Sequence, residues 1–366
     1  MSSPRSNSMH DKSPALGSQP QFAAIHRRGL LRSRLLPLTL GILVFILLAL
    51  SVAIGEYTLT LPRVCAILLG DRSSRFEATV VLSWRMPRAI TGLAVGAALG
   101  LSGAITQSLT RNGLASPDIL GVTAGASAAA VTVIIVGPTT GVLGWLSGAG
   151  IPVVAFCGAT ASAAVVWFLS FRGGRPDPAR LVVIGLLLTA MLGAYINFLM
   201  VRAKLLDAAA AQFWLTGSLT NSTWARTWPA VIVALVAIPV AWWLAFQFRA
   251  LLLGTELAQS LGQRTRATQL VALGVAIILA AVAVAAAGPI GFVAFAAPHV
   301  ARLLAGTSAP PLVTSMLTGA VLLLAADLFV RTVTPTDIPV GLITSFCGGL
   351  FLMFLLIQRR RKEVLA

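Results

Sequence analysis

Few residues in this sequence could carry out acid–base or nucleotide chemistry. Its three lysines are Lys12, Lys204 and Lys362, and none of them follows a glycine. The chain therefore lacks the phosphate-binding loop G-x-x-x-x-G-K-[ST], in which backbone N–H groups and a lysine hold nucleotide phosphates. His299 lies alone in an apolar stretch, and no two carboxylates have a spacing that suggests shared proton transfer. The sequence predicts no catalytic site, so an ATPase that drove this protein would be a separate chain.

The cysteines do not indicate a metal site. They are Cys65, Cys157 and Cys347, an odd number without C-x-x-C spacing. Cysteines of this kind are usually small apolar packing residues. We expect neither a disulfide framework nor a bound metal.

One carboxylate, Asp327, lies within a strongly apolar segment, LLLAADLFVR. An acidic residue in such a segment could couple transport to a proton or sodium gradient. Arg331 follows four residues later, one helical turn away, where it could compensate the carboxylate. Because the partner is built in, we favour a structural ion pair over an ion-coupling site.

The composition determines which elements must position these residues. Hydrophobic residues make up 57% of the chain, charged residues 10%, and the mean hydropathy is +0.90. Soluble domains contain roughly 45–50% apolar and about 25% charged residues, so lipid is the expected solvent. Unbroken apolar runs exclude the alternating strands of a membrane β-barrel. The net charge of +16 does not predict a nucleic-acid partner, since membrane proteins concentrate Lys and Arg in cytoplasmic loops.

Ten apolar segments are predicted to form membrane-spanning helices. They are residues 35–55, 87–108, 118–136, 151–171, 180–201, 228–248, 268–287, 289–305, 312–330 and 338–358. Ten spans place both termini on one side, and 18 of the 27 Lys and Arg residues then share that side, which predicts cytoplasmic termini. We expect an all-α polytopic membrane protein with a disordered tail (1–29), a transmembrane domain (30–361) and a C-terminal tail (362–366).

Glycines predict one closely packed helix face and one helix break. Gly92, Gly96, Gly100 and Gly103 recur every three or four residues, which gives a face that another helix can approach closely. Residues 268–305 are too long for one helix, and the sequence AGP at 287–289 is the expected break.

Three longer stretches resemble one known family. They run from Trp84 to Ala126 (beginning WRMPRAITGLAVG), from Gly288 to Leu304 (GPIGFVAFAAPHVARLL) and from Ala326 to Leu356 (beginning ADLFVRTVTPTDIPVG). Together they resemble the FecCD-type permeases of ABC importers for iron–siderophore complexes, haem and cobalamin, and the likeness extends over nearly all of residues 35–361.

The resemblance implies an assembly in a bacterial cytoplasmic membrane. The chain would pair with itself or with a second permease subunit. Two cytoplasmic ATPase subunits would carry ATP and Mg, and an extracytoplasmic binding protein would deliver the substrate. This chain itself would bind no cofactor and perform no hydrolysis.

Residues 249–268 are the longest predicted inner loop with helical character. Leu253, Leu257 and Leu261 recur every four residues and would form one apolar stripe between Gly254 and Gly262. The segment resembles the family's L-G-x-E-x-A-x-x-L-G coupling helix, which implies docking to the ATPase. The matching residues are Leu253, Gly254, Glu256, Ala258, Leu261 and Gly262. Without the resemblance, an amphipathic helix on the bilayer surface is the alternative.

Three arginines are expected on the outer side, namely Arg85, Arg88 and Arg331. Arginine at a membrane boundary usually extends its charged end to lipid head groups. In the family, arginines at these positions meet acidic residues on the two lobes of the binding protein, and such contacts orient docking.

Two further segments resemble gate and path motifs of the family. RNGLASPD matches the cytoplasmic gate through Asn112 and Leu114, with Gly113 in place of the usual proline, which would loosen the backbone. QFWLTGSL resembles the outer path-lining motif. It supplies Gln212, Trp214, Gly217 and Ser218.

The resemblance favours a ferric siderophore as substrate, with haem or cobalamin as alternatives. A path built from small residues suits a bulky ligand but does not separate these three. A secondary transporter that uses Asp327 for ion coupling is the alternative from a different class.

Overall fold

A computed structural model describes residues 19–55, 57–139, 150–172, 175–176, 178–252, 254–334 and 338–364. The first half contains α1 (Gln19–Ala53), α2 (Leu61–Leu68), α3 (Arg75–Thr79), the π-helical η1 (Val80–Arg85), α4 (Met86–Thr110), η2 (Pro117–Leu120), α5 (Val122–Val136), η3 (Gly137–Thr139) and α7 (Ile151–Leu169). The second half contains α8 (Pro178–Arg202), α9 (Leu205–Leu215), α10 (Trp224–Leu251), α11 (Thr255–Ser260), α12 (Thr265–Ala287), α13 (Val293–Ala305), α14 (Leu312–Val333) and α15 (Val340–Val364). A two-residue pairing of β1 (Phe171–Arg172) with β2 (Arg175–Pro176) lies between α7 and α8.

The predicted all-α membrane fold is confirmed. Within the described residues, eight helices are long and apolar enough to cross a membrane. All ten predicted segments are helical, but those at 118–136 and 289–305 contain the shorter helices α5 and α13. With 15 and 13 residues, these helices rise about 1.5 Å per residue and fall short of the roughly 30 Å hydrocarbon core.

Left-handed backbone residues explain why both helices begin late. Gly121, just before α5, has a φ of 68°, and Phe292, just before α13, has a φ of 66°. The predicted break after residue 287 is confirmed: α12 ends at Ala287, and Gly288 has a φ of 74°.

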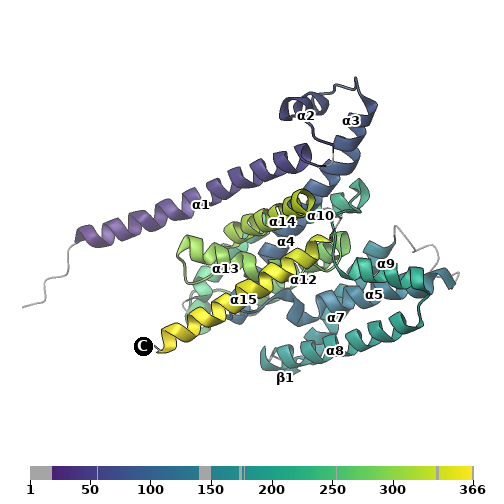
Figure 1. Cartoon of the computed structure of the whole chain (residues 1–366). Coiled ribbons are helices and arrows are strands. Elements are labelled where there is room, and N and C mark those ends of the chain that lie inside the picture. The colour runs from purple at the N-terminus through teal and green to yellow at the C-terminus, as the bar shows by residue number, and fades with distance from the viewer. Residues whose placement is uncertain are drawn as a thin grey trace, which may run out of the picture.

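The two tails are described only in part. Residues 1–18 lie outside the described residues, whereas 19–29 form the first part of α1. At the other end α15 continues to Val364. Figure 1 places the first residues of α1 and the last residues of α15 at the same end of the bundle, as an even number of spans requires.

The bundle has two ends, which we name by the short helices found there. At the α2 end, α1 finishes and α4 begins, and α2 and α3 extend beyond the end of α1 (Figure 1). At the α11 end, α4 and α10 finish and α11 begins. Helices α5, α7, α8 and α9 gather on the flank away from α1 (Figure 1).

Helix α4 is the centre of the packing. In its most apolar stretch, 89% of the residues are buried inside the protein, whereas the corresponding share in α8 is 6%. It packs against α14, α12, α10 and α13. The predicted glycine face makes these contacts possible: a methyl group on Gly96 would lie 2.5 Å from the Gly319 carbonyl oxygen, and one on Gly103 would lie 1.7 Å from that of Ala294.

We predict that Gly103→Ala destabilises the protein by about 1–3 kcal/mol, since the added methyl must displace the α13 backbone. Gly274→Ala on α12 is the matched control, because nothing lies within 4 Å of the added carbon. The control should leave stability unchanged or raise it by up to about 1 kcal/mol. Thermal unfolding of the detergent-solubilised protein measures both changes, and equal midpoints for the two variants would contradict the packing described.

Candidate functional site

The predicted coupling segment forms a short helix whose leucines face outward. Helix α11 lies between Gly254, with a φ of 105°, and Gly262, with a φ of 83°. Leu257 is 59% exposed and Leu261 is 71% exposed, whereas Ala258 is fully buried. A short helix is thus held by its small residue and presents two large apolar side chains. Leu253, the third member of the predicted stripe, lies outside the described residues, and Glu256 is exposed.

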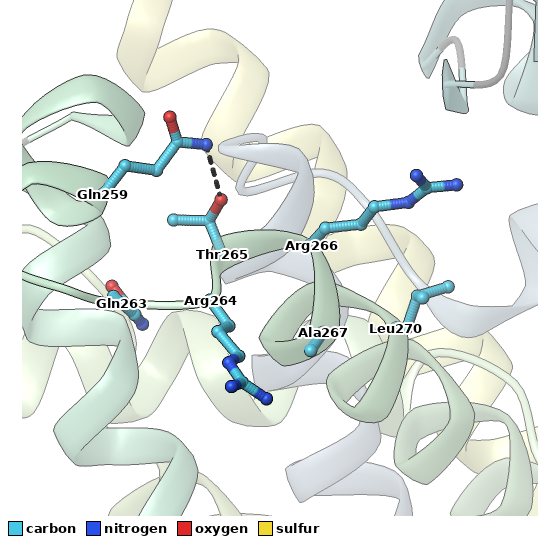
Figure 2. A pocket seen from close by; sticks show the side chains of 7 residues that line it. All are labelled: Gln259, Gln263, Arg264, Thr265, Arg266, Ala267 and Leu270. Carbon is cyan, nitrogen blue, oxygen red and sulfur yellow. Dashed lines mark hydrogen bonds between the residues drawn. The ribbon is translucent and has the colours of Figure 1, made fainter.

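Polar side chains hold the base of α11 against its neighbours. Gln259 Nε2 donates to Thr265 Oγ1 at 3.0 Å, which joins α11 to the first turn of α12 (Figure 2). Gln263 Nε2 donates to Gln247 Oε1 at 2.8 Å and to its backbone oxygen at 3.0 Å, which joins the same segment to α10. An open pocket of about 390 Å³ lies here, and Arg264 and Arg266 line it together with the two glutamines (Figure 2).

The predicted gate residues form a tight turn at the end of α4. Asn112 Oδ1 accepts a hydrogen bond from the backbone N–H of Leu114 at 2.9 Å, and the Asn112 backbone oxygen accepts one from Ala115 at 3.1 Å. Asn112 is exposed and Leu114 is 39% exposed. Gly113 does not have a positive φ, and a methyl group there would come no closer than 3.4 Å to Arg302. The turn is therefore held by Asn112 and does not require glycine at the next position.

A direct contact joins this turn to the helix that precedes α11. Arg111 has a left-handed backbone, with a φ of 50°, and its Nη2 donates to the Leu251 backbone oxygen at 3.1 Å. Leu251 is the last residue of α10. Arg111 was not predicted as a site residue, although it is the first residue of the RNGLASPD segment. The available signal was its position between the end of a helix and a turn.

The predicted outer path segment packs its backbone against the backbone of its neighbours. Gly217 has a φ of 68°, and a methyl group on it would lie 2.3 Å from the Pro289 oxygen. The Ser218 N–H donates to the Ala287 oxygen at 2.8 Å, and Gly341 N–H donates to the Gly217 oxygen at 3.0 Å. The loop is thereby joined to the break between α12 and α13 and to the start of α15.

The other two residues of this segment lie on α9. Trp214 is half-buried and packs against a cluster of residues from α5, α7 and α12, whereas Gln212 is exposed. The structure thus brings Trp214 and Gly217 into the packed part of the α2 end and leaves Gln212 at its surface.

The three predicted docking arginines are directed into the protein at the α2 end. Arg85 is 8% exposed. Its Nη1 donates to the backbone oxygens of Val52 at 3.0 Å and Ala53 at 2.8 Å, and its Nη2 donates to that of Tyr57. Carbonyls at the end of α1 have no partners within their own helix, so this guanidinium caps the helix and complements its negative end.

Arg88 and Arg331 both contact Asp327. Arg88 Nη2 lies 2.9 Å from Asp327 Oδ1, and Arg331 Nε lies 3.2 Å from Asp327 Oδ2. The Asp327 side chain is 1% exposed, and those of Arg88 and Arg331 are 13% and 9% exposed. Arg331 also donates to the Ser51 oxygen at 3.1 Å. The predicted pair is therefore present. Arg88 adds a contact from α4 to Asp327 on α14, and Arg331 adds one to Ser51 of α1. Sequence spacing could not indicate either of these two contacts.

Comparison with known proteins identifies the family. The model of the FecCD transport family matches residues 42–358. The chain belongs to this family. It is 40% identical over 311 residues to the ferric enterobactin transport system permease protein FepG of Escherichia coli (strain K12), covering 84% of this chain and 91% of the relative. It is 35% identical to the Fe(3+)-citrate import system permease protein YfmE of Bacillus subtilis (strain 168), covering 89% and 96%.

One solved structure has the same fold as this FecCD permease. An inward-facing ABC transporter assigned to the metal-chelate type matches with a TM-score of 0.75 and 26% identity, covering 88% of this chain and 98% of that one. The protein is thus a multi-pass permease subunit of the cytoplasmic membrane. Hydrolysis of ATP in such transporters belongs to a separate ATPase, in agreement with the missing phosphate-binding loop.

We predict that Asp327→Asn destabilises the permease by about 3–5 kcal/mol, because it leaves two buried guanidiniums without a counter-ion. Adding Arg88→Gln should recover part of this loss. Thermal unfolding of the single and double variants gives the interaction energy, and strict additivity within about 0.5 kcal/mol would contradict the pairing. Asp207→Asn in the first turn of α9 is the control, since no ion pair within the described residues involves Asp207.

Proposed function

We propose that this permease is the membrane subunit of a binding-protein-dependent ABC importer that moves a ferric siderophore across the cytoplasmic membrane by ATP-driven alternating access. The exposed leucines of α11 carry this proposal, because a soluble partner at that end has an apolar stripe to bind. Helix-in-groove docking uses apolar anchors of this kind, and Leu257 and Leu261 lie one turn apart.

The proposed assembly has two permease subunits, two ATPase subunits and one binding protein. The α11 end and both termini would be cytoplasmic, with ATP and Mg held by the ATPases beneath α11. The binding protein would meet the α2 end. Helix α8, which has few buried residues, leaves a broad apolar face available for lipid or for the second permease.

Motion would pass from α11 to the gate through a short chain of contacts. Movement of α11 displaces the end of α10, where Leu251 accepts the hydrogen bond from Arg111. Arg111 is followed directly by Asn112, which holds the turn with Leu114. A shift at α11 therefore changes the gate turn without first moving the buried part of α4.

The segment with Gln212, Trp214, Gly217 and Ser218 would serve at the opposite end of the path. Its backbone hydrogen bonds to the α12–α13 break and to the start of α15 would allow these elements to move together as the outer opening changes. In alternating access, this segment would close the path when the Asn112 turn opens it, and would open the path when the turn closes it.

The arginines would support docking by fixing the shape of the outer surface. Arg85, Arg88 and Arg331 hold the ends of α1, α4 and α14 together. The binding protein would thus meet a preformed surface, which limits the ordering cost of association.

The ion-coupled alternative receives no support from the surroundings of Asp327. A coupling carboxylate must take up and release a cation, but both oxygens of Asp327 already face guanidiniums. A structural role for this ion pair is favoured.

The substrate proposal is supported by the relatives, whose names specify ferric enterobactin and ferric citrate. Haem and cobalamin remain the alternatives within the family. A chelate delivered by a separate protein needs a wide path rather than a metal site, and within the described residues no group of three or more His, Cys, Asp or Glu could hold a metal.

We predict that Leu257→Ala combined with Leu261→Ala abolishes uptake while the permease still inserts in the membrane, because the apolar anchors for the ATPase are lost. Uptake of radiolabelled iron and co-purification with the ATPase measure the two effects. Leu68→Ala combined with Leu69→Ala, an exposed pair at the α2 end, is the matched control and should leave the ATPase bound. Normal uptake by the α11 double variant would contradict a role of these leucines in coupling to the ATPase.

We predict that a strain lacking this permease fails to grow when a ferric siderophore is its sole iron source. The same strain should grow on haem, and its cobalamin-dependent growth should be unaffected. Growth is measured on each source with and without the plasmid-borne gene. A defect confined to haem or to cobalamin would contradict the substrate proposal but leave the ATPase-driven mechanism standing.

A further inference from the structure

A large groove at the α2 end is not accounted for by the transport path. It has a volume of about 1060 Å³ and lies where α7 and α10 begin and α12 finishes. Helix α12 packs against both α7 and α10 and so forms the floor between them. Phe156, Val282 and Ala285 give the groove an apolar interior, and Thr223 and Arg226 lie at its polar side. Binding sites for small molecules have roughly this size and mixture of surfaces, about 300–1,000 Å³.

Exposed tryptophans place this groove at the level of the membrane–water interface. Trp84 lines it and is 60% exposed, and Trp228, one turn beyond Trp224 on α10, is 56% exposed. The rings of Trp224 and Trp228 stack with centroids 5.7 Å apart, and Trp224 Nε1 donates to the Leu82 oxygen at 2.9 Å. Tryptophan gathers at this level because its ring is apolar and its N–H is polar, so lipid head groups and the first part of their chains lie beside the groove.

Arg226 supplies an unbalanced positive charge at the groove. It lies in the first turn of α10, where the helix dipole already places partial positive charge. The positive charge of Arg226 is therefore unfavourable at this position unless an anion is bound beside it. Within the described residues, no ion pair or side-chain hydrogen bond involves its guanidinium, in contrast to those of Arg85, Arg88 and Arg331. Thr223 also lines the groove, and a guanidinium and a hydroxyl are both groups that donate hydrogen bonds to phosphate oxygens.

We propose that this groove binds one anionic phospholipid of the outer leaflet, with its phosphate on Arg226 and an acyl chain along Phe156, Val282 and Ala285. The charge of the rim selects the head group, and the tryptophans fix the depth at which the lipid binds. The bound lipid fills the space between α7 and α10, both of which pack against α12. This inference depends on the membrane fold and not on the substrate, and only the choice of leaflet rests on the orientation given under the proposed function.

The test is native mass spectrometry of the intact permease in detergent, titrated with phosphatidylglycerol and, separately, with phosphatidylcholine. The wild-type protein should bind phosphatidylglycerol more tightly. Arg226→Gln should weaken phosphatidylglycerol binding about fivefold, the effect of one basic residue near a lipid surface, and leave phosphatidylcholine binding unchanged. Arg226→Lys should largely restore the preference.

A matched arginine and a groove-filling variant separate this site from general surface attraction. Arg75→Gln removes an exposed arginine at the same end, outside the groove, and should bind both lipids as the wild type does. Ala285→Leu should weaken the binding of both lipids, with unfolding temperature and size-exclusion profile as checks of folding.

Three results would overturn the proposal. The first is unchanged phosphatidylglycerol binding by Arg226→Gln. The second is competitive displacement of phosphatidylglycerol by ferric enterobactin, which would assign the groove to the substrate. The third is loss of lipid binding whenever the permease dimerises, which would show that a second copy covers the groove.

Discussion

The close approach of α4 to its neighbours is the constraint on which the rest of the structure depends. In lipid there is little hydrophobic force between helices, so van der Waals packing at short range must hold them together. Gly96 and Gly103 permit that range because their missing side chains let the backbones of α14 and α13 come into contact. The enclosed helix that results carries Arg85 and Arg88 at one end and reaches Arg111 at the other. One enclosed helix thus connects the α2 end of the permease to the turn at Asn112.

The two ends of the bundle are fastened by different chemistry. At the α2 end, buried guanidiniums bind a carboxylate and the carbonyls that finish α1, and charge-assisted bonds of this kind are the strong ones. At the α11 end, side-chain amides and one arginine–carbonyl contact join exposed segments. The weaker fastening lies where an ATPase would push, and the stronger one where a binding protein would need a fixed surface. In the proposed mechanism, this difference would let movement start at the α11 end while the α2 end keeps its shape.

Helix positions, the glycine face, the break after residue 287 and the glycines that bracket α11 were all predictable from the sequence, because each depends on local spacing or on backbone freedom. The destinations of long polar side chains were not. Arg85, Arg88 and Arg331 were expected to face a protein partner, yet they turn inward because tertiary packing brings the end of α1 and Asp327 within their reach. The sequence also did not indicate that α5 and α13 are short, because the left-handed backbone of Gly121 and Phe292 lies within segments that are apolar enough to read as continuous helix.

The claim that ATP hydrolysis by a separate subunit drives this permease through α11 can be tested in proteoliposomes. The complete complex would be reconstituted with its binding protein and supplied with ferric siderophore under two conditions. With ATP and no ion gradient, iron should accumulate inside the vesicles. With a proton or sodium gradient and the permease alone, no iron should accumulate. Accumulation driven by an ion gradient in the absence of the ATPase would contradict ATP-driven transport through α11.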